Sequence, residues 1–232
     1  LSDWSSDVCS SDLSRKPRFL PRDVIEKLFE EVYRHENNLQ DRAILEVLYG
    51  SGLRREETGR LTLANIVERD KLRVIGKRNV ERYTIITNPE YLALRDHCIN
   101  TLGDDRTLEL AVEINEDAAF DDLRKRMPEA PVFYTAEGVP LTELADPGKY
   151  IWKRVMHYAK LIGEEITPHQ FRHSFATHLL SEGIDIYKVS KMLGHRDIRT
   201  TTIYLGLEDK VFDEVRRAHP RTGAIPAWAK AV

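Results

Sequence analysis

The sequence predicts a mainly helical fold with one small antiparallel β-sheet, which places it in the α+β class. Three observations support this prediction. Apolar residues recur at helical spacing in several segments, short β-branched runs cluster between residues 66 and 86, and proline, aspartate and glycine stand where helices would begin and end. The chain has 232 residues, 41% of them hydrophobic, so it can bury one substantial core.

Two helices and then the sheet are expected in the N-terminal half. The first helix starts near Pro21, and the second starts at Asp41 and ends before Gly50 and Gly52. Their apolar positions are Val24, Ile25, Leu28, Phe29 and Val32, followed by Ile44, Val47 and Leu48. The runs that predict an antiparallel meander are Ile66 to Val67, Leu72 to Ile75 and Tyr83 to Ile86.

Further helices are expected in the C-terminal half. One starts at Asp146-Pro147 and stops at Gly163, the next starts at Thr167-Pro168, and a shorter one follows Asp185 and closes at Gly194. The apolar positions of the first two are Ile151, Val155, Tyr158 and Ile162, then Phe171, Phe175 and Leu179. A last amphipathic helix would carry Val211, Phe212 and Val215.

Composition divides the chain into segments. Residues 1–16 are rich in serine and aspartate and aperiodic, so we expect a disordered or artefactual tail. Residues 17–218 are expected to form the folded domain, with an acidic insertion at about 104–130, and residues 219–232 a C-terminal tail. We expect the insertion to be solvated surface, and the alternative is a partner site.

Net charge and cysteine usage limit the function classes. A net charge of −3 argues against a strongly basic nucleic-acid binder. The acids are concentrated, however, because residues 1–13 hold three acids and no bases and residues 104–130 hold nine acids and four bases, which leaves the remainder net positive. Cys9 and Cys98 form no disulfide framework or paired metal spacing, and no run of about eighteen apolar residues occurs. A cytoplasmic location is therefore expected.

The segment Thr167-Pro168-His169-Gln170-Phe171-Arg172-His173 is the first candidate for chemistry. His169 and Arg172 lie three apart at a helix N-terminus, where partial positive charge and a planar guanidinium suit a phosphate. A capping histidine and a solvated arginine are the alternative. The i, i+4 spacing of His169 and His173 also fits zinc ligands, but the glutamate of a zinc hydrolase is missing between them.

Read onward, the segment is similar to the signature of the tyrosine recombinases, also called phage-type integrases. HxxRH is followed by Leu193-Gly194-His195 and, nine residues after that histidine, by Tyr204. Upstream, Gly52-Leu53-Arg54-Arg55-Glu56-Glu57 resembles the family's GLRxxE box, and Gly76-Lys77 its hairpin lysine. The resemblance runs from about Arg18 to Arg221, and the flanking marks Arg18-Phe19-Leu20 and His219-Pro220-Arg221 look most like the Xer-like members.

The resemblance implies a tyrosine recombinase catalytic-domain fold for residues 17–218 and six catalytic residues. Tyr204 would attack a backbone phosphate to form a 3'-phosphotyrosyl link. Arg54, Arg172 and His195 would stabilise the transition state, Lys77 would act as general acid and His169 would accept the tyrosine proton. No cofactor or metal ion is expected.

Each residue also has an ordinary structural interpretation when it is taken singly. Arg54 would pair with Glu57 on its helix turn, Lys77 would be a solvated hairpin residue, His195 a turn residue and Tyr204 a half-buried aromatic. His173 is expected to be structural or to support a catalytic neighbour, and His178 is undetermined. It is the joint order of the motifs that favours the catalytic interpretation.

The resemblance further implies double-stranded DNA as partner and self-association into a tetrameric synapse on it. The alternatives are a DNA-binding or regulatory module that does not cut, and a relaxing enzyme like type IB topoisomerases. Family members usually carry an N-terminal core-binding domain, and nothing before Pro17 would form it, so we expect a fragment or a truncated reading frame.

Overall fold

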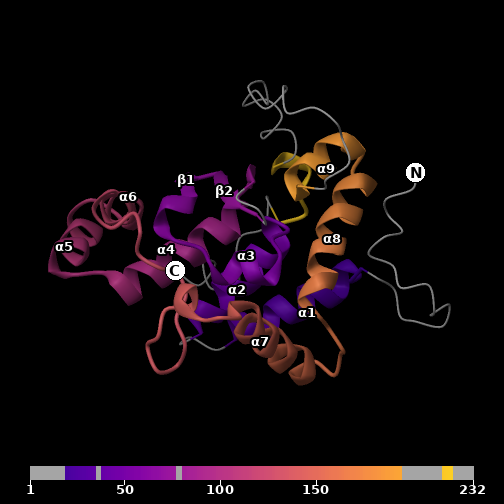
Figure 1. Cartoon of the computed structure of the whole chain (residues 1–232), viewed down its shortest axis with the longest axis horizontal. Helices are drawn as coiled ribbons and strands as arrows, with labels where there is room; N and C mark the ends of the chain where they lie inside the picture. The colour runs from indigo at the N-terminus through magenta and orange to yellow at the C-terminus, as the bar shows by residue number, and fades with distance from the viewer. Residues whose placement is uncertain (1–18, 35–37, 77–79, 195–215, 222–232) are drawn as a thin grey trace.

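The computed structural model of the chain describes residues 19–34, 38–76, 80–194 and 216–221. Helices surround a central buried helix, and a small sheet lies to one side (Figure 1). The helices are α1 (Arg22–Tyr33), α2 (Leu39–Gly50), α3 (Arg55–Gly59), α4 (Asn88–Leu102), α5 (Asp105–Glu113), α6 (Glu116–Arg126), α7 (Pro147–Leu161), α8 (Pro168–Ser181) and α9 (Ile186–Leu193). The strands are β1 (Ile66–Glu68), β2 (Lys71–Ile75) and β3 (Glu81–Ile85), and short 3₁₀ turns span Leu63–Asn65 and Leu141–Glu143.

The predicted α+β class is therefore confirmed, and the predicted helix starts and stops are close to those observed. Asp146 accepts a hydrogen bond from the backbone N–H of Lys149, and Asp185 accepts one from the N–H of Tyr187, as N-caps do. Gly194 ends α9 in the left-handed conformation with φ of +67°. The second helix begins at Leu39, two residues before the predicted Asp41, which is instead a buried residue of its first turn.

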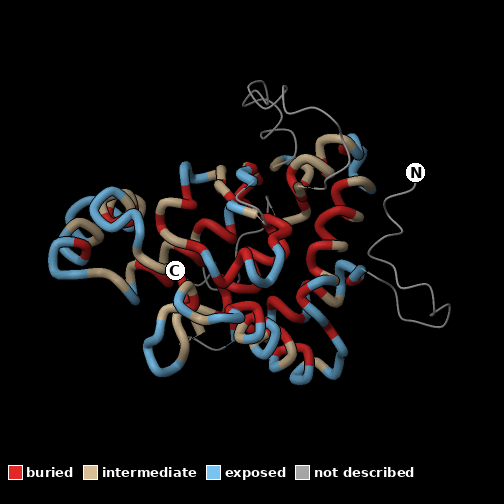
Figure 2. The backbone as a smooth tube through the Cα atoms, viewed as in Figure 1, coloured by how far each residue is buried: buried red, intermediate tan, exposed pale blue. Residues whose placement is uncertain are grey.

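Helix α2 forms the centre of the core, because almost every one of its residues is buried. It packs against α1, α4, α7 and α8. Figure 2 shows the resulting pattern, with buried backbone running through the middle of the molecule and exposed backbone at the α5–α6 end. A second cluster joins α8, α9 and β3 through Ile85, Phe175, Leu179, Val189 and Leu193. This cluster holds the C-terminal helices against the sheet.

The sheet has the order β1-β2-β3 and is antiparallel throughout. Leu72 pairs with Thr84 and Val74 with Arg82, so one face of both strands is buried. A charged residue on this inward face needs a partner. Arg82 has one, as described below, and it links the sheet to two other segments.

The acidic stretch at about 104–130 contains two helices that the sequence did not predict. Asp104 caps α5 through the N–H of Thr107, and Asn115 caps α6 through the N–H of Ala118. Phe120 of α6 packs edge-on against Tyr91 of α4, with ring centroids 5.8 Å apart. The stretch is thus a helical hairpin attached to α4 through α6.

The C-terminal residues that the structure describes, 216–221, pack against the core helices. The His219 ring is buried with its centroid 4.9 Å from that of Tyr49, and its Nε2 donates to the carbonyl of Tyr49. The Arg221 guanidinium pairs with Glu46 and lies 3.9 Å from the Phe29 ring centroid. None of the described helices is long and apolar enough to span a membrane.

Candidate active site

The start of α8 places His169 and Arg172 in different surroundings. Thr167 caps the helix and Pro168 occupies its first turn, while the Gln170 side chain accepts from the backbone N–H of Thr167 at 2.9 Å. His169 is exposed and Arg172 is only 5% exposed, although both lie on the first turn and a half. The predicted pair therefore offers one solvent-facing imidazole and one buried guanidinium.

Arg172 joins three segments that are far apart in the sequence. Its Nη1 donates to the carbonyl of Gly52 at 2.8 Å, and its Nη2 donates to the carbonyl of Leu193. Gly52 is the first residue of the GLRxxE box, and Leu193 is the first residue of the Leu193-Gly194-His195 segment. The structure therefore brings the GLRxxE, HxxRH and LGH segments together at one guanidinium.

Gly52 has to be a glycine for this arrangement. Its φ is +63°, and a Cβ at this position would lie 2.8 Å from the Phe175 ring. The chain can therefore turn closely over α8 and present the Gly52 carbonyl to Arg172.

Arg54 lies at the N-cap of α3, next to this junction. Its Nη1 pairs with Glu57 Oε1 at 3.0 Å, which is the contact that the ordinary interpretation of Arg54 predicts. The Arg54 side chain is 42% exposed, so solvent screens the pair and its contribution to stability is no more than about 1 kcal/mol. A guanidinium this exposed still has N–H groups facing solvent and can bind a phosphate.

Glu57 and Arg82 form a buried ion pair behind Arg54 that sequence reasoning did not identify as a unit. The Arg82 Nη1 and Nη2 atoms donate to Glu57 Oε1 and Oε2 at 2.9 and 2.6 Å. Burial raises the pKa of the Glu57 carboxyl, but the hydrogen bonds and charge of Arg82, with the N–H and charge of Arg54, outweigh burial and lower the pKa to about 2. The signal in the sequence that could have identified this pair is an arginine, Arg82, at an inward-facing position of a strand.

The histidines of α8 contact neighbouring aromatic side chains. The His169 and His173 rings meet edge to face with centroids 4.3 Å apart. His178, whose role the sequence left undetermined, is buried, and its Nδ1 lies 2.8 Å from the Tyr49 hydroxyl. Burial lowers the pKa of His178, as expected for a histidine that packs in the core.

Three predicted catalytic residues, Lys77, His195 and Tyr204, lie outside the described residues. So do Val211, Phe212 and Val215 of the predicted last helix. Lys77 belongs to the connection between β2 and β3, and His195 follows directly on Gly194. Their catalytic roles, and those of Arg54, His169 and Arg172, stay predictions.

Among the residues that the structure describes, no group of three or more histidine, cysteine, aspartate or glutamate side chains could hold a metal ion. His169 and His173 therefore lack a third ligand of these kinds within the described part of the chain. Cys98 is buried as a free thiol, and burial raises its pKa.

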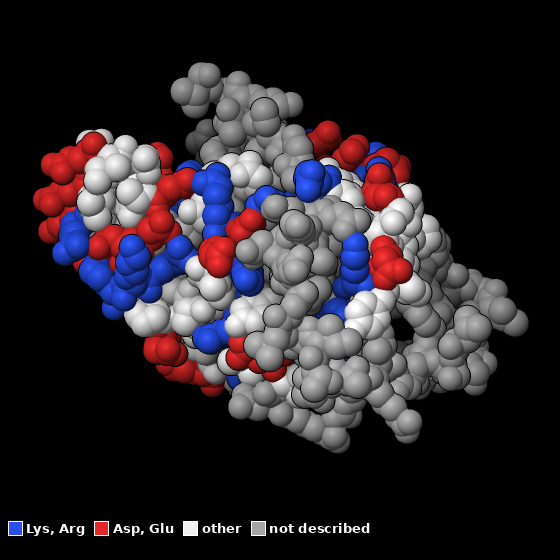
Figure 3. All heavy atoms as spheres, turned by 90° about the horizontal axis from the view of Figure 1, so that it is seen from above, with Lys and Arg blue, Asp and Glu red and all other residues white. Residues whose placement is uncertain are grey.

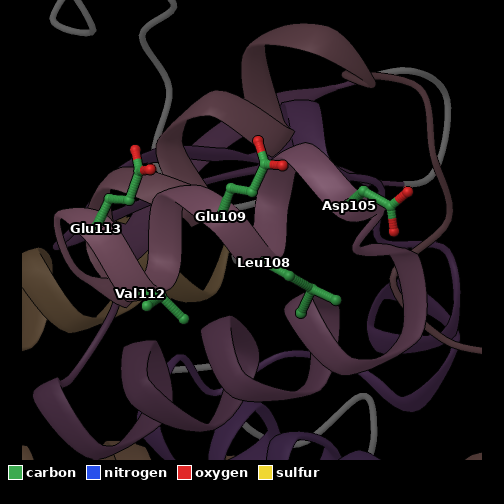
Figure 4. A pocket seen from close by; sticks show the side chains of 5 residues that line it. All are labelled: Asp105, Leu108, Glu109, Val112 and Glu113. Atoms are coloured by element: carbon green, nitrogen blue, oxygen red, sulfur yellow. The ribbon is translucent and has the colours of Figure 1, made fainter.

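Charge is distributed unevenly over the surface. In the view of Figure 3, acidic side chains gather at the α5–α6 end beside a group of lysine and arginine side chains, and further lysine and arginine side chains lie toward the middle of that face, with some acidic ones among them. A shallow hollow on α5 is lined by Asp105, Leu108, Glu109, Val112 and Glu113 (Figure 4). The hollow lies on the hairpin and not at the junction around Arg172.

Comparison with known proteins places the chain in a family. The model of the phage integrase family matches residues 18–210. Tyrosine recombinase XerD of Proteus mirabilis is 32% identical over 216 residues, covering 89% of this chain and 62% of that protein. Tyrosine recombinase XerA of Pyrococcus furiosus is 31% identical, covering 88% and 62%, and XerC of Natranaerobius thermophilus is 33% identical, covering 95% and 69%.

Solved structures agree on the fold. A crystal structure of XerA recombinase has a TM-score of 0.58 at 23% identity, covering 89% of this chain and 66% of that one. XerH site-specific recombinase bound to its difH substrate has a TM-score of 0.56 at 21% identity, covering 81% and 50%. The fold is that of tyrosine recombinase catalytic domains. The chain belongs to the phage integrase family, and it spans slightly less than two thirds of XerD and XerA.

Proposed function

We propose that this chain is the catalytic part of a site-specific recombinase that cleaves and rejoins double-stranded DNA, with residues 17–218 as its catalytic domain. What carries the proposal is Arg172, because one buried guanidinium contacts both the Gly52 carbonyl and the Leu193 carbonyl. Segments whose order in the sequence suggested one active site thus meet in space. Membership of the phage integrase family supports the same function.

In the proposed reaction, the Tyr204 hydroxyl oxygen attacks a backbone phosphorus and displaces the 5' oxygen of the next nucleotide. His169 accepts the tyrosine proton, and Lys77 donates a proton to the leaving oxygen, which departs as a 5'-hydroxyl. Arg54, Arg172 and His195 stabilise the additional negative charge on the phosphate oxygens. The 3'-phosphotyrosyl bond keeps the energy of the phosphodiester, so a second 5'-hydroxyl can reverse the step and join strands without ATP.

The DNA would be held mainly through its phosphates by basic side chains. Binding of this kind weakens as salt rises, because the release of condensed counterions gains less free energy in a more concentrated salt solution. We further propose that copies of the chain associate on DNA into a synapse. Relatives bound to DNA, such as XerH on difH and the Tn1549 transposon integrase on circular intermediate DNA, support the choice of partner.

A nicked suicide duplex tests cleavage, because the short strand diffuses away and leaves the protein attached. The wild-type chain should form a covalent protein–DNA adduct, and Tyr204→Phe should form none. The adduct should persist in excess EDTA, since protein groups supply all the charge stabilisation in the proposed reaction. Loss of the adduct in EDTA and its recovery with magnesium would contradict the metal-independent reaction.

The same substrates separate the alternative functions. DNA binding without any adduct would identify a module that does not cut. Relaxation of supercoiled plasmid without recombinant products would favour a relaxing enzyme like the type IB topoisomerases.

A further inference from the structure

Arg82 is a buried guanidinium that reaches from the sheet to two separate segments. It is 4% exposed, and all three of its nitrogens have partners. Nη1 and Nη2 bind the two oxygens of Glu57 at 2.9 and 2.6 Å, and Nε donates to the carbonyl of Met192 at 2.9 Å. One side chain on β3 thus connects α3 with the C-terminal end of α9.

The first contact leads to Arg54. Glu57 Oε2 accepts from the backbone N–H of Arg54 at 2.9 Å, and Glu57 Oε1 accepts from the Arg54 Nη1 at 3.0 Å. Arg82 binds both oxygens of this carboxylate, so it fixes the orientation of the carboxylate that Arg54 contacts. The Arg54 guanidinium is therefore oriented from behind by a carboxylate that is itself clamped.

The second contact leads to the segment that ends at His195. The Met192 carbonyl lies in the last turn of α9, where carbonyls lack helical partners and attract a cation. Gly194 is tightly packed on the same side chain, because a Cβ there would lie 2.8 Å from Arg82 Cδ. The guanidinium and the stem of Arg82 both fix the backbone that leads into His195.

We propose that Arg82 is a positioning residue for the strand transfer described above. It sets the Arg54 box relative to the backbone of residues 192–194, which leads into His195, without touching the DNA itself. The inference rests on the proposed function, because Arg54 and His195 are its proposed phosphate-binding groups. Arg172 bridges the same two regions through Gly52 and Leu193, so the two arginines act as parallel links.

A contribution to folding stability does not by itself explain why position 82 is an arginine. A buried ion pair contributes little net stability, since the cost of removing both charges from water offsets their attraction. What an arginine supplies is geometry, because its planar fork binds both carboxylate oxygens while Nε reaches a third partner. A lysine keeps the charge but not this set of three directed bonds.

The first test compares Arg82→Lys with the matched control Arg154→Lys. Arg154 also forms a two-point pair with a buried aspartate, Asp41, but on α7, away from the junction. Adduct formation on the suicide duplex is measured in single turnover at saturating protein, at a temperature where circular dichroism shows every variant folded. Arg82→Lys should slow cleavage by about 10- to 100-fold with DNA affinity within about threefold, as for a small misplacement of catalytic groups. Arg154→Lys should stay within about twofold of the wild type.

The pH profile gives a readout that a merely structural role would not change. In Arg82→Gln, Glu57 stays buried without its strongest partner, so its pKa should rise and the carboxyl should become protonated as the pH falls. Cleavage by this variant should then decrease at low pH more steeply than cleavage by the wild type. The double variant Arg82→Gln/Glu57→Gln should lose that extra dependence, since no carboxyl remains to titrate.

Hydrogen exchange tests the link without relying on activity. Arg82→Lys should increase exchange both in residues 52–58 and in residues 190–194, and Arg154→Lys should change neither. Wild-type cleavage by a folded Arg82→Lys protein would overturn the inference while leaving the proposed function intact. If the wild type itself forms no adduct, the proposed function fails, and unchanged exchange in either segment would overturn the link as well.

Discussion

Arg172 is a buried charge that joins two distant segments and that we propose stabilises the transition state. Two of its nitrogens bind backbone carbonyls, those of Gly52 and Leu193, so the guanidinium is held in a fixed orientation. A guanidinium has five N–H groups, and its planar fork matches phosphate oxygens as well as carbonyls. Pre-set orientation of this kind is what electrostatic stabilisation of a transition state requires.

The substitution Arg172→Lys tests this role. A lysine keeps the charge but cannot hold both carbonyls and a phosphate in a planar array, so we expect cleavage to fall by about 10²- to 10³-fold. Binding to the uncut duplex should change much less, because many other phosphate contacts remain. Single-turnover adduct formation and a filter-binding titration measure the two effects. Equal cleavage by the variant and the wild type would argue against a phosphate-clamping role.

His97 gives a prediction about stability and pH. The ring is 3% exposed, and its Nε2 donates to the Val132 carbonyl at 2.8 Å. Burial, opposed only weakly by this hydrogen bond, lowers its pKa to about 4. In the unfolded chain the pKa is about 6.5, so acid protonates the unfolded state first. The folded state should lose stability as the pH falls from about 6.5 to about 4 and should gain none above that window.

Urea unfolding at pH 7.5 and pH 5.0 measures this effect. Linkage gives a loss of about 2 kcal/mol from His97 alone between the two values. His219 is also buried neutral and contributes in the same direction, so the wild type is compared with His97→Gln. The variant should show a pH dependence smaller by about 2 kcal/mol. An unchanged pH dependence would mean that folding leaves the pKa of His97 unshifted.

At the scale of elements, the α5–α6 hairpin is a part of the fold that the sequence did not predict. Its acids are partly neutralised within the hairpin, since Arg126 binds Asp104 and Asp122 and Arg106 also binds Asp122. Such exposed pairs contribute little stability. What holds the hairpin is the face of α6 that buries Ala119, Phe120 and Leu123.

The outer helix α5 should therefore tolerate substitution. Leu108 and Val112 are 53% and 88% exposed, and they form a row beside the row of Asp105, Glu109 and Glu113 (Figure 4). Leu108→Gln and Val112→Gln should each change the free energy of unfolding by no more than about 0.5 kcal/mol. Leu123→Ala, at a fully buried position of α6, should cost about 2–5 kcal/mol.

Thermal and urea unfolding of the three variants check this contrast. A large loss of stability from Leu108→Gln would show that the face of α5 that carries Leu108 is packed in the folded chain. The prediction of solvated surface would then be wrong for α5 as well as for the buried face of α6.

At the scale of the whole molecule, the last predicted helix bears on assembly. Val211, Phe212 and Val215 lie at helical spacing close after Tyr204, and an isolated helix of about ten residues is marginal in water. If these residues form such a helix, we expect it to dock either on its own chain or on a neighbouring one. We expect docking on its own chain without DNA and exchange between chains on DNA, in a cyclic head-to-tail arrangement.

Mixing two inactive proteins tests the exchange. One is Tyr204→Phe, which lacks the nucleophile, and the other ends after Asp209, which removes the helix but keeps Tyr204. If the helix is donated between chains, the mixture should form an adduct on the suicide duplex, and its size should identify the truncated chain. Absence of any adduct over a range of protein ratios would rule out donation.

The sequence by itself determined the class of fold and the ends of many elements. Local chemistry was sufficient there, because a cap at Asp146 or Asp185 and a left-handed glycine at Gly194 depend on neighbours a few residues away. The α4 helix and the α5–α6 hairpin escaped prediction. The buried residues of α4 belong to the core that it shares with α2, while the hairpin has few apolar positions among its charges and gains burial where α6 packs on α4. The order of the motifs also pointed to the residues that we propose as catalytic.

Only the tertiary structure decided how the motif segments meet. The contacts of Arg172 with Gly52 span 120 positions in the sequence, and those of Arg82 with Met192 span 110. No local pattern encodes such a contact, because a buried guanidinium can be satisfied by any carbonyl or carboxylate that folding brings within reach. For the same reason Glu57 seemed from the sequence to be only a helix-turn partner of Arg54. In the folded chain its carboxylate is shared with Arg82, which ties the first arginine box to the sheet.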